Sequence, residues 1–222
     1  MKALLKLGIL IPIFLLVFAS QTTAQVIGRL TYMEGWVDIL HGGEARFTPC
    51  SEEDSVSLKD IVRTAANGKA VIELTNRNVL RLAPLTKIDM EEYLEVKERA
   101  GTIKLSRGKV RIIAPRKFRI IPVVFREEPA FEVHTPTAVV GIRGGDAFVF
   151  HERGITGAIF VKGSGYAYSV RFPDVVRKIG ASEAVFIPGY APPFPPRPVS
   201  KSQIAMHAED TASTEEEEAS VE

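Results

Sequence analysis

Arg143 is well placed for chemistry in this sequence, because it lies in Gly141-Ile-Arg-Gly-Gly145, where glycines allow the backbone to bend. Its forked guanidinium can donate to several carbonyl oxygens of neighbouring turns, or to a carboxylate or phosphate of a ligand. Irregular corners leave carbonyls in need of donors, so we expect a structural clamp. The alternative is an anion-binding nest in the Gly-rich turn, which lacks the spacing of a Walker loop or a dinucleotide fingerprint.

A run of basic side chains between Lys97 and Arg126 could also bind a ligand, since its ten basic residues face one opposing acid, Glu98. Such a field attracts polyanions. The candidate binding residues are Arg107, Lys109, Arg111, Arg116, Lys117 and Arg119. Alternation along a strand puts Lys109 and Arg111 on one face, with Val110 and Ile112 pointing inward. The alternative is a solvated outer face that discourages edge-to-edge aggregation.

The remaining polar residues do not predict an enzyme. The histidines show neither an i,i+4 pair nor a His-x-His spacing, so no metal site is expected; they are His41, His134, His151 and His207. Gly163-Ser-Gly165 lacks the second spacer of a nucleophile elbow. Nothing near the single cysteine, Cys50, suggests a base that would activate it, and we expect a small loop residue beside Pro49. We therefore predict a non-enzymatic protein without catalytic residues, cofactor or metal.

Short strands separated by turns fill the region from Val26 to Pro188. A Gly turn followed by alternating apolar residues recurs, which is typical of hairpins or of corners between strands. These units are Glu34–Ile39, Asn67–Leu74, Arg107–Ile113 and Gly163–Val170. A helical turn or two is expected only within Glu91–Arg99. The pattern predicts an all-β domain of stacked β layers, either a β-sandwich or a β-solenoid.

The segment Phe131–Phe150 combines these signals. Pro136 fixes its own φ and favours an extended Thr135, while Gly141 and Gly144 permit positive φ in a bend. The segment therefore predicts a strand, a tight corner and a second strand.

This segment resembles the signature of the FecR domain. Thr135, Pro136, Gly141, Arg143 and Gly144 occupy places that match the family's Thr-Pro and Gly-Val-Arg-Gly-Thr motifs, and Gly145 stands where the family has Thr. The resemblance extends to further segments: Gly28–Val37, Asp60–Thr64, Asn67–Leu74 and Gly108–Val110. It implies the FecR-domain fold. It does not carry a specific partner with it.

Regulatory members of that family combine a cytoplasmic anti-sigma region, one membrane helix and a FecR domain outside the membrane. Here only six residues precede an apolar run, Leu7–Ala19. We therefore expect a standalone exported member that lacks the anti-sigma region.

The first residues have the layout of a secretory signal peptide. Lys2 and Lys6 precede the apolar run, and polar residues follow it up to Ala24. The run is shorter than the ~20 residues of a spanning helix, so no transmembrane span is expected after cleavage. We predict a signal peptide at residues 1–24 and a periplasmic or secreted protein of the bacterial cell envelope. The alternative is an uncleaved membrane anchor.

Charge divides the chain unequally. Residues 1–208 carry 28 basic against 20 acidic residues, a net charge of +8, whereas Glu209–Glu222 carries seven acidic residues and no basic ones. We predict a FecR-like β domain at 25–188, a Pro-rich linker or strap at 189–205, and an acidic disordered tail at 206–222.

Two function hypotheses follow. One is an exported binding or signalling module for an envelope protein or an acidic polysaccharide; the other is an architectural secreted component. Nucleic acid is not an expected partner outside the cytoplasm.

Overall fold

A computed structural model describes residues 25–90, 101–114 and 131–212. The strands before the first gap are β1 (Val26–Glu34), β2 (Val37–Leu40), β3 (Thr48–Pro49), β4 (Ser55–Ser57), β5 (Ile61–Thr64), β6 (Lys69–Leu74), β7 (Val79–Leu82) and β8 (Lys87–Asp89). The later strands are β9 (Gly101–Ala114), β10 (Phe131–His134), β11 (Ala138–Glu152), β12 (Ile155–Ser169), β13 (Phe172–Ile179), β14 (Glu183–Pro188) and β15 (Arg197–Pro198). The helix α1 spans Lys201–Glu209.

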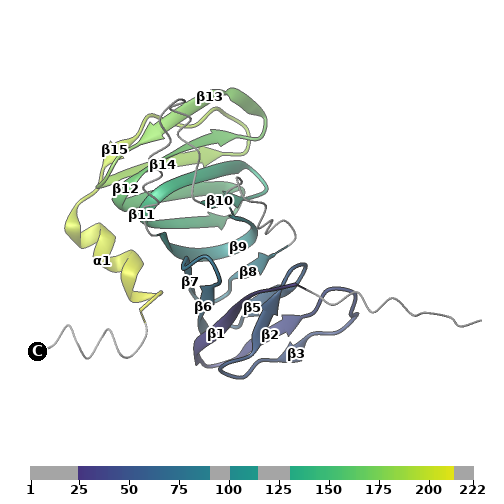
Figure 1. Cartoon of the computed structure of the whole chain (residues 1–222). Helices are drawn as coiled ribbons and strands as arrows, with labels where there is room; N and C mark the ends of the chain where they lie inside the picture. The colour runs from purple at the N-terminus through teal and green to yellow at the C-terminus, as the bar shows by residue number, and fades with distance from the viewer. Residues whose placement is uncertain (1–24, 91–100, 115–130, 213–222) are drawn as a thin grey trace, which may run out of the picture.

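One continuous sheet folds over on itself and makes two layers. The layer that contains Thr135, here named the signature layer, has the order β3–β2–β5–β8–β9–β10–β11–β12–β13. The other, named the helix layer, has the order β4–β1–β6–β7–β9–β11–β12–β14–β15. The long strands β9, β11 and β12 each contribute one half to each layer. Figure 1 shows the strands stacked from β1–β3 at one end to β13–β15 at the other.

Glycines mark the points where the long strands pass between the layers. Gly108 in β9, Gly144 in β11 and Gly163 in β12 have φ of 91°, 134° and 86°, values that glycine adopts at little cost. A Cβ at Gly163 would lie 1.8 Å from the carbonyl oxygen of Gly144, so adjacent corners are in close contact. The predicted stacked β layers are therefore confirmed, and two of the Gly-plus-strand units are these corners.

Alternating side chains from both layers form one hydrophobic core. In β9, Ile103 and Leu105 point inward from the signature layer, and Val110 and Ile112 point inward from the helix layer; all four are 0% exposed. The inward direction predicted for Val110 and Ile112 is confirmed. Full burial of a side chain of this size contributes about 1.5–3 kcal/mol.

The chain beyond Pro188 differs from the predicted linker and disordered tail. Pro193 is buried and its carbonyl oxygen accepts a hydrogen bond from Nε of Arg177 in β13, while β15 pairs with β14. Helix α1 then includes residues 206–209, which the prediction placed in the tail. Its N-terminus is stabilised by a capping box between Ser200 and Gln203.

Helix α1 lies against the outer surface of the helix layer (Figure 1). Ile204 and Ala208 pack beside Phe148, and the ring of His207 stacks on that of Phe150 with centroids 5.4 Å apart. This packing explains why a short helix persists next to an acidic sequence: a few apolar contacts and a cap hold it in place.

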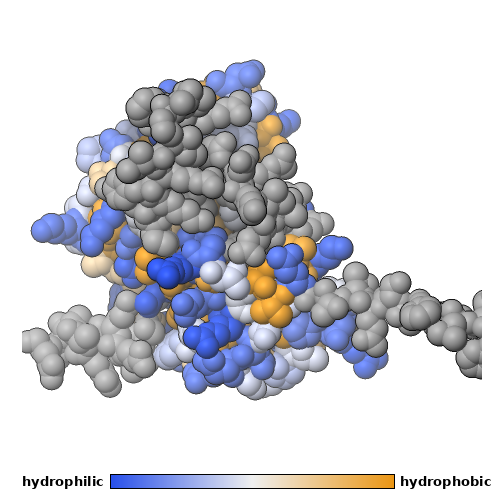
Figure 2. Space-filling view, viewed as in Figure 1, coloured by the Kyte–Doolittle hydropathy of each residue, from blue (hydrophilic) through white to orange (hydrophobic). Residues whose placement is uncertain are grey.

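Some predictions concern residues that the structure does not describe. The signal peptide at 1–24, the helical turn at 91–99 and residues 213–222 of the tail lie outside the described ranges. Within those ranges, no helix has the length and apolar character needed to cross a membrane. Among the coloured residues of Figure 2, hydrophilic side chains predominate and hydrophobic ones form smaller groups.

Candidate binding face

Thr135 joins β10 to β11 through a network of hydroxyl groups. Its Oγ1 accepts from the backbone N–H of Ala138 at 2.9 Å and lies 2.6 Å from Oγ1 of Thr156. Thr156 in turn contacts the hydroxyl of Thr137 at 2.6 Å and Nδ1 of His151 at 3.0 Å. Burial lowers the pKa of His151. The network satisfies polar groups at a buried corner, which is a structural role.

The outer surface of the signature layer, here named the signature face, carries Glu132, Tyr166 and His134. The hydroxyl of Tyr166 donates to Oε1 of Glu132, and Nε2 of His134 lies 2.9 Å from Oε2 of the same carboxylate. The hydrogen bonds from His134 and Tyr166 lower the pKa of Glu132 against the opposing effect of burial. Burial and the hydrogen bond to Glu132 raise the pKa of Tyr166. Glu132 is therefore an ionised acceptor held by two neighbours.

Gly141 is required by the aromatic ring above it. A Cβ at this position would lie 2.2 Å from Cζ of Tyr166, which pairs with Gly141 in register. Arg143 follows two residues later on the same strand, half-buried, and its positive charge acts to lower the pKa of Tyr166. The signature glycine thus makes room for a side chain on the neighbouring strand.

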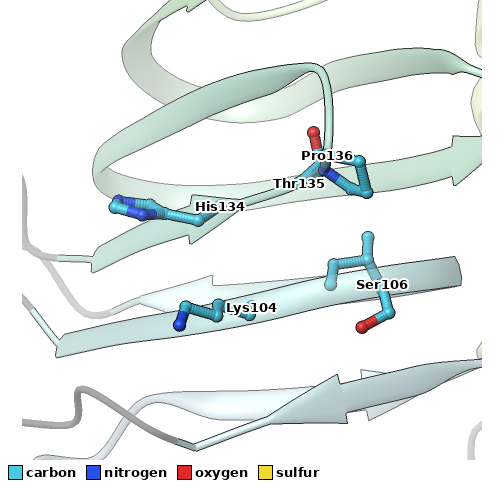
Figure 3. A pocket seen from close by; sticks show the side chains of 6 residues that line it. Lys104, Ser106, His134, Thr135 and Pro136 are labelled. Atoms are coloured by element: carbon cyan, nitrogen blue, oxygen red, sulfur yellow. The ribbon is translucent and has the colours of Figure 1, made fainter. Parts of the chain in front are cut away.

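A hollow of about 320 Å³ opens on the signature face between β9 and the corner after β10. Its lining comprises Lys104, Leu105, Ser106, His134, Thr135 and Pro136. Figure 3 shows Lys104 and Ser106 on one strand, opposite His134, Thr135 and Pro136. The hollow therefore combines an ammonium, a hydroxyl and an imidazole, groups suited to a polar or anionic ligand.

A row of cations crosses the signature face beside this hollow. Arg63 of β5 pairs in register with Lys87 of β8, which pairs with Arg107 of β9. Arg63 also contacts Asp38 at 2.6 Å and lies 3.8 Å from the centroid of the Phe47 ring. We name Arg63, Lys87 and Arg107 the basic row.

Asp89 lies near the basic row. Burial raises the pKa of Asp89, although the positive charges of Lys104 and Lys87 oppose this shift.

The six predicted binding residues do not form one surface. Arg107 lies in the basic row, whereas Lys109 and Arg111 lie on the outer surface of the helix layer. Nζ of Lys109 is 2.6 Å from Oδ2 of Asp210, and Arg111 donates to both carboxylate oxygens of Asp146 at 3.0 and 2.8 Å. Strand β9 passes from the signature layer to the helix layer at Gly108, and this crossing separates Arg107 from Lys109 and Arg111. Arg116, Lys117 and Arg119 lie outside the described residues.

The cysteine and the metal-ligating residue types do not form a reactive centre in the described part of the chain. Cys50 is buried, and burial with the nearby carboxylates of Asp54, Asp38 and Asp60 raises its pKa to about 12. The thiol is thus protonated at neutral pH, which makes it a poor nucleophile. Among the described residues, no cluster of His, Cys, Asp and Glu side chains could hold a metal ion.

Sequence reasoning did not identify Arg63, Lys87, Tyr166 or Tyr168 as parts of a face. These residues come from three different strands, and strand register brings them to one surface. His134 and Glu132 are two residues apart on β10, so alternation along the strand places both on the same outer face.

Comparison with known families identifies the region that contains the signature. Residues 60–164 match the model of the FecR protein family. These residues form a FecR domain. The match spans β5 to most of β12 and confirms the resemblance inferred from Thr135, Pro136, Gly141, Arg143 and Gly144. Comparison with the curated proteins finds no match.

Solved structures show a similar fold. Two crystal structures of a putative anti-sigma factor from Parabacteroides distasonis ATCC 8503, at 2.50 and 1.65 Å resolution, superpose with a TM-score of 0.51 at 15% and 14% identity. The alignments cover 65% of this chain and 62% of each matched chain, so the chain spans less than two thirds of those proteins. At this identity the likeness concerns the fold alone.

Proposed function

We propose that this protein is an exported, non-enzymatic binding module of the cell envelope whose signature face recognises an anionic partner. A signalling role fits this proposal, because the FecR domain and the name of the structurally similar anti-sigma factor both suggest a regulatory setting. Export is supported by the basic residues and the apolar run of residues 1–24.

The basic row is the observation that carries the proposal. Like charges directly opposite each other in a sheet are destabilising, yet Lys87 lies opposite Arg107 and also opposite Arg63, whose charge is paired with Asp38. Lys104, two register pairs further along β9, adds a fourth cation and pairs with both Asp89 and His134. An anionic partner would relieve this repulsion and would bind fastest at low salt.

The arrangement suits contact with a polymer better than catalysis. The basic row extends across three strands, about 10 Å at the usual strand spacing, on an open sheet surface. A chain of repeated negative charges can contact all three cations, whereas a small substrate would contact one or two.

Salt elution from a polyglutamate resin, which acts as a cation exchanger, tests the proposal. The double variant Lys87→Gln, Arg107→Gln should elute at clearly lower salt than the wild type. The double variant Arg153→Gln, Lys162→Gln is its matched control, because it removes the same amount of positive charge from two exposed positions outside the basic row. Arg153 lies in the turn between β11 and β12, and Lys162 lies on β12. Each lost contact with a polyanion lowers the dependence of affinity on salt concentration.

Equal elution of the two double variants would refute the signature face as the anion site. If neither double variant changed the salt concentration at which the protein elutes, the result would instead favour the alternative hypothesis, an architectural secreted component. Unfolding midpoints equal to that of the wild type would show that neither double variant acts through loss of the fold.

A further inference from the structure

Two tyrosines of the signature face form a flat aromatic surface. Tyr166 and Tyr168 are two residues apart on β12, so both side chains leave the same face of the strand. The ring of Tyr166 passes over Gly141 of β11, and its hydroxyl reaches Glu132 of β10. The ring must therefore lie along the sheet and cannot stand upright on it.

The ring of Tyr168 extends this surface. It is parallel to that of Tyr166 within 6°, with centroids 6.3 Å apart, and it pairs in register with Val139, which is 6% exposed. Both rings are half-buried, so each covers the sheet with one side and keeps part of its area accessible. We name Tyr166 and Tyr168 the tyrosine platform.

A parallel, sheet-bound pair of rings matches the shape of a sugar chain. The negative face of an aromatic ring attracts the polarised C–H groups on one side of a pyranose. Tyrosine also supplies this contact area with little loss of conformational entropy, because it has only two side-chain torsions. A peptide of acidic residues has no comparable flat C–H surface.

Register connects the platform to the cationic part of the face. Lys104, His134, Val139 and Tyr168 occupy successive positions on β9, β10, β11 and β12. At the usual strand spacing this line is roughly 14 Å long. It passes the hollow beside His134 and ends next to the basic row, so one extended ligand can reach both the rings and the cations.

We propose that the signature face binds an acidic polysaccharide whose pyranose rings stack on the tyrosine platform while its carboxylates face Lys87 and Arg107. This inference rests on the proposed function, because the basic row supplies the attraction, and it adds the chemical class of the partner. The platform discriminates a glycan from other polyanions, and the basic row discriminates an acidic glycan from a neutral one.

Binding of three defined polymers tests the inference. Polygalacturonate has rings and carboxylates, polyglutamate has carboxylates without sugar rings, and dextran has sugar rings without carboxylates. The wild type should bind polygalacturonate most tightly. Tyr168→Ala should weaken that binding about tenfold, the effect of losing one stacked ring, and should leave polyglutamate binding unchanged. Tyr168→Phe, which keeps the ring, should restore most of the affinity.

Tyr32→Ala is the matched control, because Tyr32 lies on β1 of the helix layer, whereas the tyrosine platform belongs to the signature layer. Equal loss of polygalacturonate and polyglutamate binding in Tyr168→Ala, or no loss of either, would overturn the glycan inference. If either result were found, the proposed anion site would still be supported as long as the double variant Lys87→Gln, Arg107→Gln lost binding to both polygalacturonate and polyglutamate. Binding of dextran as tight as that of polygalacturonate would overturn the acidic character of the ligand.

Discussion

At the scale of single residues, the signature glycines are explained by their neighbours. Gly141 lies under the ring of Tyr166, and Gly163 faces the carbonyl oxygen of Gly144, so each position excludes a Cβ for a different reason. The first glycine keeps space for an aromatic side chain. The second lets two adjacent strands turn the same corner together.

Gly141→Ala should destabilise the protein by about 1–3 kcal/mol, because the new Cβ would displace the ring of Tyr166 and weaken its hydrogen bond to Glu132. In a Tyr166→Ala background the same substitution should cost much less, since the ring is gone. Urea unfolding of the four proteins in this double-mutant cycle measures the coupling. Additive effects would mean that the ring does not explain the glycine.

Gly163→Ala should destabilise the corner more strongly than Gly154→Ala. Both glycines have positive φ, 86° and 76°, so both substitutions carry the backbone penalty of about 1 kcal/mol. Only at Gly163 does the added Cβ also meet a backbone oxygen, at 1.8 Å, whereas nothing lies within 4 Å at Gly154. Similar urea midpoints for the two variants would contradict the close contact between the corners of β11 and β12.

At the scale of elements, helix α1 is held by limited contacts. None of its residues is buried, and its contacts with the helix layer come from Ile204, His207 and Ala208, followed by the ion pair between Asp210 and Lys109. Burial and the nearby charge of Lys109 lower the pKa of His207, while Asp210 opposes this. The packed helix therefore favours neutral histidine.

The packing of α1 should weaken with acid. Because the pKa of His207 is lower in the folded protein than its ordinary value of 6.5, its contribution is complete above that pH and is lost as pH falls through the lowered pKa. Hydrogen exchange of residues 201–209, corrected for the intrinsic pH dependence of exchange, should accelerate between pH 7 and pH 5. His207→Phe keeps a ring against Phe150 and should remove this pH dependence. If exchange in His207→Phe still accelerated with falling pH as in the wild type, groups other than His207 would cause the pH dependence.

The sequence allowed the strands to be predicted more reliably than the helix. Alternation correctly assigned Val110 and Ile112 to the core and Lys109 and Arg111 to one outer face, because a strand surface depends on local periodicity. Helix α1 was missed since its short apolar side lies between a Pro-rich segment and an acidic one. Its stability depends on Phe148 and Phe150, more than 50 residues away in the sequence.

At the scale of the whole molecule, one folded-over sheet distributes neighbouring residues of the sequence to opposite surfaces. The basic stretch predicted as one site is divided at Gly108, with Arg107 on the signature face and Lys109 on the helix layer. Conversely, the basic row gathers Arg63, Lys87 and Arg107 from distant positions. No local pattern in the sequence contains this register, so only the three-dimensional structure identifies the face.

Lysine labelling with an amine-reactive reagent, with and without bound polygalacturonate, shows whether the signature face is the surface that binds the polymer. We expect the polymer to slow modification of Lys87 and Lys104 on the signature face. Lys162 and Lys201 are exposed elsewhere and should react at unchanged rates. Mass spectrometry of the digested protein measures all four rates in one experiment. Uniform protection of all four lysines, or protection of Lys162 and Lys201 alone, would contradict the signature face as the binding surface.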